Sequence, residues 1–294
     1  MENFGGKLIF SSEESTWNLK REFWVQQKYF TEAELASRPC SSFTEQWQEI
    51  KSQGRCLIVG DSSASEVLAA FSSVPREIEL LQSCDSVLRV QNRWWPRNFW
   101  SMALRESLVA RAQQLDTHRV AYLTGTGGHA FASLVVLAQL GFKRIMWVVT
   151  KFGDNELQKQ FFLKHFFGVS VEFIVGQGLT LQANNGSILI NTLTYSSGVD
   201  FLQDLIYLNF LQKGGVVVET QLESLDSQLL IEAGSVGVHS VPAWYLEGAR
   251  DYLLLQDLMS QDPTSQGEHL PEVGIYLEQW HNFLKTRPTL SQNK

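Results

Sequence analysis

The sequence predicts an α/β protein whose central part is a doubly wound, mostly parallel β-sheet. Two observations carry this prediction. Between residues 117 and 237, short apolar runs of the strand type alternate with apolar segments of the helix type. Such alternation is typical of parallel strands that are buried on both faces. The second observation is a glycine-rich turn, Gly125-Thr126-Gly127-Gly128, between the first of these strands and the helix that follows.

Composition sets the broad class of the protein. The chain has 294 residues, 44% of them hydrophobic, which is enough for one large domain or two smaller ones. Its formal net charge of −7 argues against general nucleic-acid binding, which needs concentrated Lys and Arg. No uncharged apolar run is long enough to cross a bilayer, and the first residues lack a signal-peptide pattern. We therefore expect a cytoplasmic protein with no membrane or nucleic-acid partner.

The number and spacing of the cysteines and histidines indicate a reducing compartment and no metal site. Cys40, Cys56 and Cys84 form no CxxC pair, and their spacing fits no zinc site. The histidines are scattered without metal-ligand spacing. An odd, sparse cysteine count is typical of a reducing compartment. We expect no metal.

The first hundred residues predict a small α/β domain. Strands are expected at 7–10, 55–61 and 86–90, and helices at 15–29 and 65–71, the latter after serines that suit a helix start. Residues 99–115 carry apolar side chains at helical spacing and predict an amphipathic helix that connects this region to the next.

From residue 117 onward the alternation is regular. Gly141 and Gly168 are placed to end helices. Two further amphipathic helices are expected near the end of the chain, at 244–258 and 273–284. The elements expected before these two helices are strands at 119–123, 144–149, 169–174, 187–191, 215–219 and 235–238, and helices at 130–138, 157–167, 201–211 and 225–233.

The glycine turn is the first candidate site. A strand, a glycine-rich turn and a helix place backbone N–H groups at the positive end of a helix, which suits a pyrophosphate. Gly125 permits the tight turn, and Gly127 or Gly128 allows the phosphate to approach. The pattern is not a full GxGxxG, so a tight turn that binds nothing is the alternative. The candidate cofactor-binding residues here are Gly125, Thr126, Gly127, Gly128 and His129.

The ends of two strands add candidate cofactor-binding residues. NAD-binding sites usually have an acidic residue at the end of the second strand, but here that strand ends Val149-Thr150-Lys151. Lys151 suits a 2′-phosphate and favours NADP; the alternative is a solvated surface lysine. Asn191 ends the fourth strand and is a candidate for the nicotinamide side, or simply a polar strand-end residue.

Several of these segments resemble the shikimate dehydrogenases. Leu123 to Ala130 is similar to that family's Gly-x-Gly-Gly-Ala turn, Leu189 to Thr192 to its Val-Ile-Asn-Ala-Thr strand end, and Val216 to Glu219 to its next strand. Glu247 falls near the family's substrate-contacting Gln. The resemblance implies a substrate-type domain at 1–100, a dinucleotide-binding Rossmann-like domain at 101–240, helices at 241–294 that return to the first domain, and an active cleft between the domains.

The sequence departs from that family at its acid–base residues. The strand that carries the family's catalytic Lys reads Leu57 to Ser63, without Lys, and the segment that carries its Asp reads Trp94 to Trp100, without Asp. Proton transfer needs a positioned acid–base group. The sequence therefore predicts a degenerate relative that binds a ligand or a protein partner and does not oxidise shikimate. The alternative is an NADP-dependent oxidoreductase for a different small hydroxy acid or cyclic alcohol, its acid–base residue drawn from Asp61 or Glu247.

Residues 93–100 read Arg-Trp-Trp-Pro-Arg-Asn-Phe-Trp, which is unusual in an acidic chain. Arg93 and Arg97 can clamp an anion, and Trp95 can stack on a ring or a cation. With Asp61 and Glu247 they are the predicted cleft residues, for a small anionic or aromatic ligand or a protein partner, with a homodimer as a further option. The alternative is that the rings pack the domain junction and the arginines are surface charges.

Overall fold

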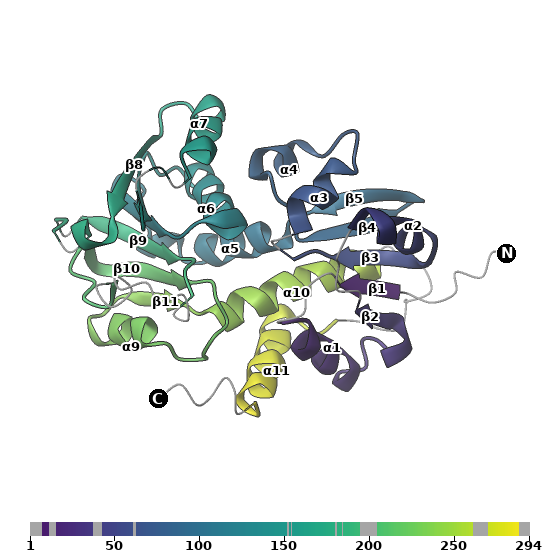
Figure 1. Ribbon diagram of the computed structural model, residues 1–294. Helices are drawn as coiled ribbons and strands as arrows, with labels where there is room; N and C mark the ends of the chain where they lie inside the picture. The colour runs from purple at the N-terminus through teal and green to yellow at the C-terminus, as the bar shows by residue number, and fades with distance from the viewer. Residues whose placement is uncertain are drawn as a thin grey trace. The chain divides into compact units, whose positions relative to one another are not determined.

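The computed structural model describes residues 8–11, 16–37, 43–60, 63–151, 153, 155–179, 181–183, 185–194, 205–260 and 270–287 (Figure 1). The chain divides into two compact units, Met1–Phe99 with Asp251–Glu272, and Trp100–Arg250 with Val273–Lys294. The domain boundaries expected at residues 100 and 240 stay predictions, because compactness does not show that a unit folds by itself.

The first unit is built on a mixed five-stranded sheet in the order β2-β1-β3-β4-β5. β1 is parallel to both β2 and β3, whereas β3, β4 and β5 pair antiparallel. The turn between β4 and β5 consists of Gln91 and Asn92, both in the left-handed conformation that tight hairpins favour. The strands are β1 (Leu8–Ser11), β2 (Leu35–Ser37), β3 (Gly54–Ile58), β4 (Ser86–Val90) and β5 (Arg93–Arg97).

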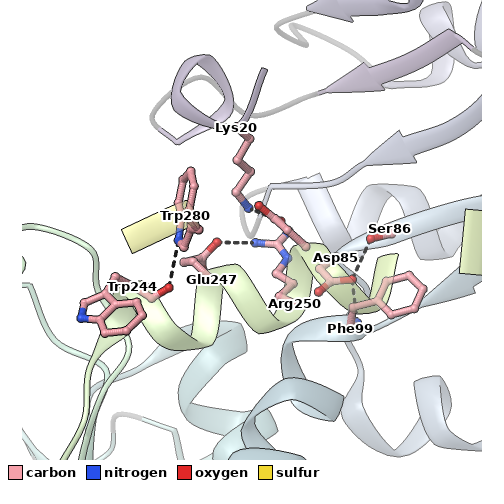
Figure 2. A network of polar contacts seen from close by, with 9 residues as sticks. Lys20, Asp85, Ser86, Phe99, Trp244, Glu247, Arg250 and Trp280 are labelled. Atoms are coloured by element: carbon pink, nitrogen blue, oxygen red, sulfur yellow. Dashed lines mark hydrogen bonds and ion pairs between the residues drawn. The ribbon is translucent and has the colours of Figure 1, made fainter. Parts of the chain in front are cut away.

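Helices cover this sheet. Phe43, Trp47 and Ile50 repeat at helical spacing and turn one face of α2 toward a core that it shares with Leu57 and Val87. The helical elements of the unit are α1 (Trp17–Gln26), η1 (Glu32–Glu34), α2 (Phe43–Gln53), α3 (Ala64–Ala69) and α4 (Arg76–Leu81). Asp85, directly before β4, accepts hydrogen bonds from the Ser86 hydroxyl and the Phe99 backbone N–H, at 2.9 and 3.0 Å (Figure 2).

The second unit contains six parallel strands in the order β11-β10-β9-β6-β7-β8, which confirms the predicted doubly wound sheet. The order reverses between β6 and β9. Right-handed crossovers run in opposite directions from this point, so α6 and α7 cover one face and α9 the other (Figure 1). The strands are β6 (Val120–Thr124), β7 (Arg144–Val149), β8 (Ser170–Val175), β9 (Gly186–Asn191), β10 (Leu211–Glu219) and β11 (His239–Val241).

The helices of this unit follow the prediction closely where caps are clear. α6 contributes a continuous buried run from Ala130 to Leu137. α10 and α11 match the helices expected at 244–258 and 273–284 to within two residues, and α10 extends across the division between the two units. The helix expected at 99–115 starts as predicted, but α5 ends at Val109 and only the short η3 follows it. The helices are α5 (Phe99–Val109), η3 (Ala112–Gln114), α6 (Gly127–Gln139), α7 (Glu156–His165), η4 (Gly176–Gly178), α9 (Gln228–Ser235), α10 (Ala243–Ser260) and α11 (Val273–Lys285).

The sixth strand was predicted in the wrong place, at 235–238. Ser227 caps α9 through its side chain, so the helix starts later than expected and continues to Ser235. Gly237 then adopts a left-handed φ of 71°, and the Val238 N–H donates to the Ala233 carbonyl, which closes the helix end. The strand therefore begins only at His239.

The helix predicted at 201–211 is also wrong at its carboxyl end. Residues 201–204 lie outside the described part of the chain. Leu208 has a left-handed φ of 47°, which ends any helix, and Leu211 already belongs to β10. In the described part of the chain, no helix combines the length and apolar character needed to cross a membrane.

Candidate functional site

The glycine turn joins β6 to α6 and leaves the start of that helix open. Thr126 precedes α6 with an extended backbone, and its side chain caps none of the described amides. Gly125 and Gly127 have φ angles of 96° and 86°, which glycine adopts readily. Thr126 and Gly127 are exposed. The first turn of a thirteen-residue helix is therefore accessible at the carboxyl edge of the sheet, an arrangement that suits a phosphate.

Gly125 is held from one side by β9 and the residues after it. A Cβ atom at Gly125 would overlap the Thr192 hydroxyl and crowd the Leu193 side chain. That hydroxyl donates to the Thr124 carbonyl at 2.7 Å. By contrast, no described atom lies within 4 Å of the position that a Cβ at Gly127 would occupy. The turn is thus tightly packed at its first glycine and open at its second.

The other side of the turn is held by β7 and the start of α7. The Gly125 carbonyl accepts a hydrogen bond from the Trp147 indole Nε1 at 2.8 Å and another from the Asn155 amide Nδ2 at 3.1 Å. Trp147 is fully buried in β7, and Asn155 directly precedes α7. Two side chains from outside the turn therefore fix one of its peptide groups.

A buried polar network lies beneath the turn. Thr124, Asn191 and Glu219 end three neighbouring strands and are partners in the sheet register. The Thr124 hydroxyl donates to Asn191 Oδ1 at 2.6 Å, and Asn191 Nδ2 donates to Glu219 Oε1 at 3.4 Å. The Ser227 hydroxyl donates to the other carboxylate oxygen of Glu219. Asn191, predicted for the nicotinamide side, is fully buried and its amide joins the strand ends; a contact with nicotinamide stays a prediction.

His129 and Lys151 flank the turn. The His129 ring stacks on the Trp100 indole, with ring centroids 4.4 Å apart and planes 17° apart. This contact orients the imidazole at the third residue of α6. Lys151 is exposed two residues after β7, on the same edge of the sheet as the glycine turn. The structure thus brings all the predicted cofactor-binding residues to the carboxyl edge of one sheet.

Comparison with known proteins gives no match to any protein-family model or any curated protein sequence. Solved structures match over nearly the whole chain. Quinate dehydrogenase from Corynebacterium glutamicum gives a TM-score of 0.74 at 11% identity, covering 95% of this chain and 100% of its own. Shikimate 5-dehydrogenase from Listeria monocytogenes gives 0.72 at 11%, covering 94% and 96%. The 5-ketofructose reductase of Gluconobacter sp. strain CHM43 gives 0.71 at 15%, covering 95% and 99%.

The chain has the shikimate dehydrogenase fold. The resemblance seen in the glycine turn and the strand ends is confirmed at the level of the fold.

Within the shikimate dehydrogenase fold, the Arg–Trp segment forms the edge strand β5. Arg93 is exposed, and the Trp95 side chain is 37% exposed. Trp94 instead packs on Trp47 in the core of the first unit, with ring centroids 5.3 Å apart. The Arg97 guanidinium lies 3.8 Å from an Asp257 carboxylate oxygen. Asp61 lies outside the described residues.

Two charged pairs are buried on α10. Glu247, predicted as a cleft residue, is 5% exposed and accepts a hydrogen bond from Arg250 at 3.4 Å (Figure 2). Lys20 of α1 lies 3.1 Å from Asp251, and both side chains are 2% exposed. Sequence reasoning missed Lys20, although a signal existed: it occupies the buried face of α1 between Trp17 and Trp24, at helical spacing. Lysine is almost never fully buried unless paired.

Two titratable groups near the sheets are held in their neutral forms. Burial raises the pKa of the Tyr122 hydroxyl to about 12, although the Arg144 charge acts to lower it. Burial, with a smaller effect from the Asp85 charge, raises the pKa of the Cys84 thiol. A protonated thiol is a weak nucleophile, so Cys84 is a packing residue. Among the described residues, no group of three or more His, Cys, Asp or Glu side chains is placed to hold a metal ion.

Proposed function

We propose that this protein binds a nicotinamide dinucleotide at the amino end of α6. The observation that carries the proposal is the open helix start at Thr126 and Gly127, framed by two left-handed glycines. A diphosphate supplies the acceptors and the negative charge that an uncapped helix start attracts. The shared fold supports this, because the matched C. glutamicum quinate dehydrogenase is in complex with NAD and one matched shikimate dehydrogenase is in complex with NADP+.

The preferred dinucleotide is NADP. An acidic residue at the end of the second strand would accept hydrogen bonds from the free ribose of NAD. Here β7 ends at Val149, and Thr150 and Lys151 follow. An exposed ammonium at this place attracts a 2′-phosphate by charge, whereas it cannot accept the hydrogen bond that a 2′-hydroxyl donates to an acidic residue.

The proposed dinucleotide binding does not require that the protein oxidises shikimate. Residues 57–63 contain no Lys and residues 94–100 contain no Asp, so the acid–base groups expected from the family resemblance are missing. The protein is then a divergent relative whose first unit binds a small anionic or aromatic ligand, or a protein partner.

One observation favours a second candidate function. The first unit buries the Lys20–Asp251 pair, and buried, closely paired charged groups occur at catalytic sites as well as in structural ion pairs. This supports an NADP-dependent oxidoreductase for a small hydroxy acid or cyclic alcohol other than shikimate.

Calorimetric titration with NADPH and NADH tests the binding proposal. Thr126→Asp places a carboxylate at the start of α6, where it caps the helix and competes with the diphosphate. We expect tighter binding of NADPH than of NADH, and a large loss of affinity in Thr126→Asp at a thermal stability equal to or above that of the unmodified chain. Thr16→Asp, at the uncapped start of α1, is the matched control.

An unmodified chain that binds neither dinucleotide at millimolar concentration contradicts the proposal. Turnover assays then separate the two candidate functions. NADP-dependent oxidation of quinate-like alcohols or hydroxy acids supports the oxidoreductase, and binding without turnover supports the ligand-binding role.

A further inference from the structure

The Gly125 carbonyl is unusual because two side-chain donors share it. Trp147 Nε1 and Asn155 Nδ2 donate to this one oxygen at 2.8 and 3.1 Å. A carbonyl oxygen has two lone pairs, so these donors satisfy it fully. The indole N–H of a buried tryptophan needs an acceptor, and Trp147 has no exposed surface. The orientation of the Gly125 carbonyl is therefore fixed from inside the protein.

That orientation decides where the next amide points. No cis peptide bond occurs in the described chain, and a trans peptide is planar with its C=O and N–H antiparallel. With the Gly125 carbonyl turned toward Trp147 and Asn155, the Thr126 N–H points away from them. β7 lies on one side of β6 and β9 on the other. A dinucleotide diphosphate crosses such a sheet where the strand order reverses, which here is between β6 and β9.

Asn155 also ties a second segment to the turn. It adopts a left-handed φ of 61°, precedes α7, and lies four residues after Lys151. Its amide thus connects two segments: the one after β7, which would contact a 2′-phosphate, and the turn that would hold the diphosphate. Asparagine tolerates this backbone conformation better than most residues. The residue type therefore suits both the left-handed backbone and the side-chain hydrogen bond.

We propose that Trp147 and Asn155 are positioning residues for the dinucleotide: they hold the Gly125–Thr126 peptide with its N–H toward the diphosphate, and Asn155 couples that peptide to the segment that carries Lys151. The inference rests on the proposed dinucleotide binding and adds which side chains prepare the site. Neither residue contacts the ligand itself. Both act before binding, by removing orientations of the peptide that a diphosphate would otherwise have to select.

Asn155→Gly provides a sharp test because glycine adopts the left-handed backbone readily and removes the side chain that carries the amide. We expect NADPH affinity to fall about three- to tenfold, the range for loss of one hydrogen bond. Asn155→Asp keeps the shape but sets an acceptor against a carbonyl and a negative charge beside the diphosphate, so its loss is larger. Asn92→Gly removes another left-handed asparagine, in the β4–β5 hairpin, and is the matched control.

A spectroscopic readout separates positioning from general stability. In the unmodified chain, NADP+ should move the Thr126 amide resonance strongly downfield, and this shift should shrink in Asn155→Gly while the melting temperature matches that of Asn92→Gly. Trp147→Phe, which keeps an aromatic ring but removes the N–H, should give the same smaller shift.

The outcomes are distinguishable. If the unmodified chain binds NADPH and both Asn155 variants bind it equally well, the positioning role is wrong and the proposed function stands. If the unmodified chain binds no dinucleotide, the proposed function fails and the positioning role fails with it.

Discussion

At the residue scale, the two left-handed glycines of the turn serve different purposes. Gly125 is needed both for its φ angle and for the space that Thr192 occupies, whereas Gly127 is needed for its φ angle and for access to the helix start. The first is a packing constraint set by β9, and the second concerns what approaches from solvent. A glycine motif in a sequence does not distinguish these two roles, because the residue is glycine in both cases.

Alanine at each glycine should separate them. Gly127→Ala should cost about 1–2 kcal/mol of unfolding free energy, the strain of a left-handed residue with a Cβ. Gly125→Ala should cost about 1–3 kcal/mol more, because the added Cβ overlaps the Thr192 hydroxyl. Urea unfolding measures both. Equal losses would show that the packing of Thr192 against Gly125 is unimportant.

The buried Lys20–Asp251 pair makes a second prediction at this scale. Removing one partner strands a buried charge, so Lys20→Met or Asp251→Leu alone should destabilise the fold by about 3–5 kcal/mol. The double variant removes both charges and should recover most of that loss. Additive losses in the double-mutant cycle would show that the two side chains are not coupled. The exposed Arg76–Glu79 pair on α4, whose removal should cost under about 1 kcal/mol, is the control.

The sequence could predict the glycine turn because its signal is local: a strand, two glycines needing positive φ, and a helix within twenty residues. It could not predict Trp147, Asn155 or Glu219 as members of the same site. Their contacts with the turn depend on which strands are neighbours, and a single sequence does not state the strand order. Lys20 is intermediate, since its place on an apolar helix face is visible but its partner, Asp251, is far away in the chain.

At the scale of elements, α10 and α11 show how close packing depends on one small residue. A Cβ at Gly248 would come within 2.6 Å of the Trp280 ring and 2.8 Å of the Leu277 side chain, so glycine lets the helices approach. Trp280 Nε1 donates to the Trp244 carbonyl at 3.0 Å (Figure 2). The His281 ring stacks on Trp244, with centroids 3.9 Å apart and planes 2° apart.

The His281 stack should make stability depend on pH. Burial lowers the pKa of His281, the Lys285 charge lowers it further, and Asp226 partly opposes this. The folded chain thus favours the neutral ring, whose stabilising effect is complete above the unfolded pKa of about 6.5 and is lost as pH falls through the folded value. Urea unfolding at pH 7.5 and 5.5 measures the loss. His281→Phe keeps a stacked ring without a charge and should show a smaller drop; an identical drop would exclude His281 as the cause.

The boundaries of an element could be predicted where a helix-capping residue is recognisable in the sequence. They could not be predicted where pairing with another part of the chain determines them. Gly141 ends α6 as expected, and β7 matches its prediction at both ends. The Ser235–Val238 run is apolar enough for a strand, yet the Ser227 cap and Gly237 assign it to a helix end. β5 was missed because Arg93 to Arg97 lacks the alternation of a strand, and pairing with β4 makes it one.

At the scale of the whole molecule, the chain passes between its two units more than once. Residues 251–272 belong to the first unit, although the residues before and after them belong to the second. One helix, α10, contributes its first part to the second unit and its last part to the first. Helix formation is cooperative, so loss of either unit removes support from a helix that the other also uses.

Shared use of α10 should make the two units unfold together. We expect a single thermal transition, with circular dichroism and tryptophan fluorescence coinciding, because each unit contains buried tryptophans, among them Trp17 in the first and Trp147 in the second. NADPH at about 100 times its dissociation constant adds about 2.7 kcal/mol, which should raise the whole transition by about 4–8 °C. Native-state hydrogen exchange should then show added protection in strands of both units. Two transitions, of which NADPH moves only the one that reports on β6 to β11, would show that α10 does not couple the units.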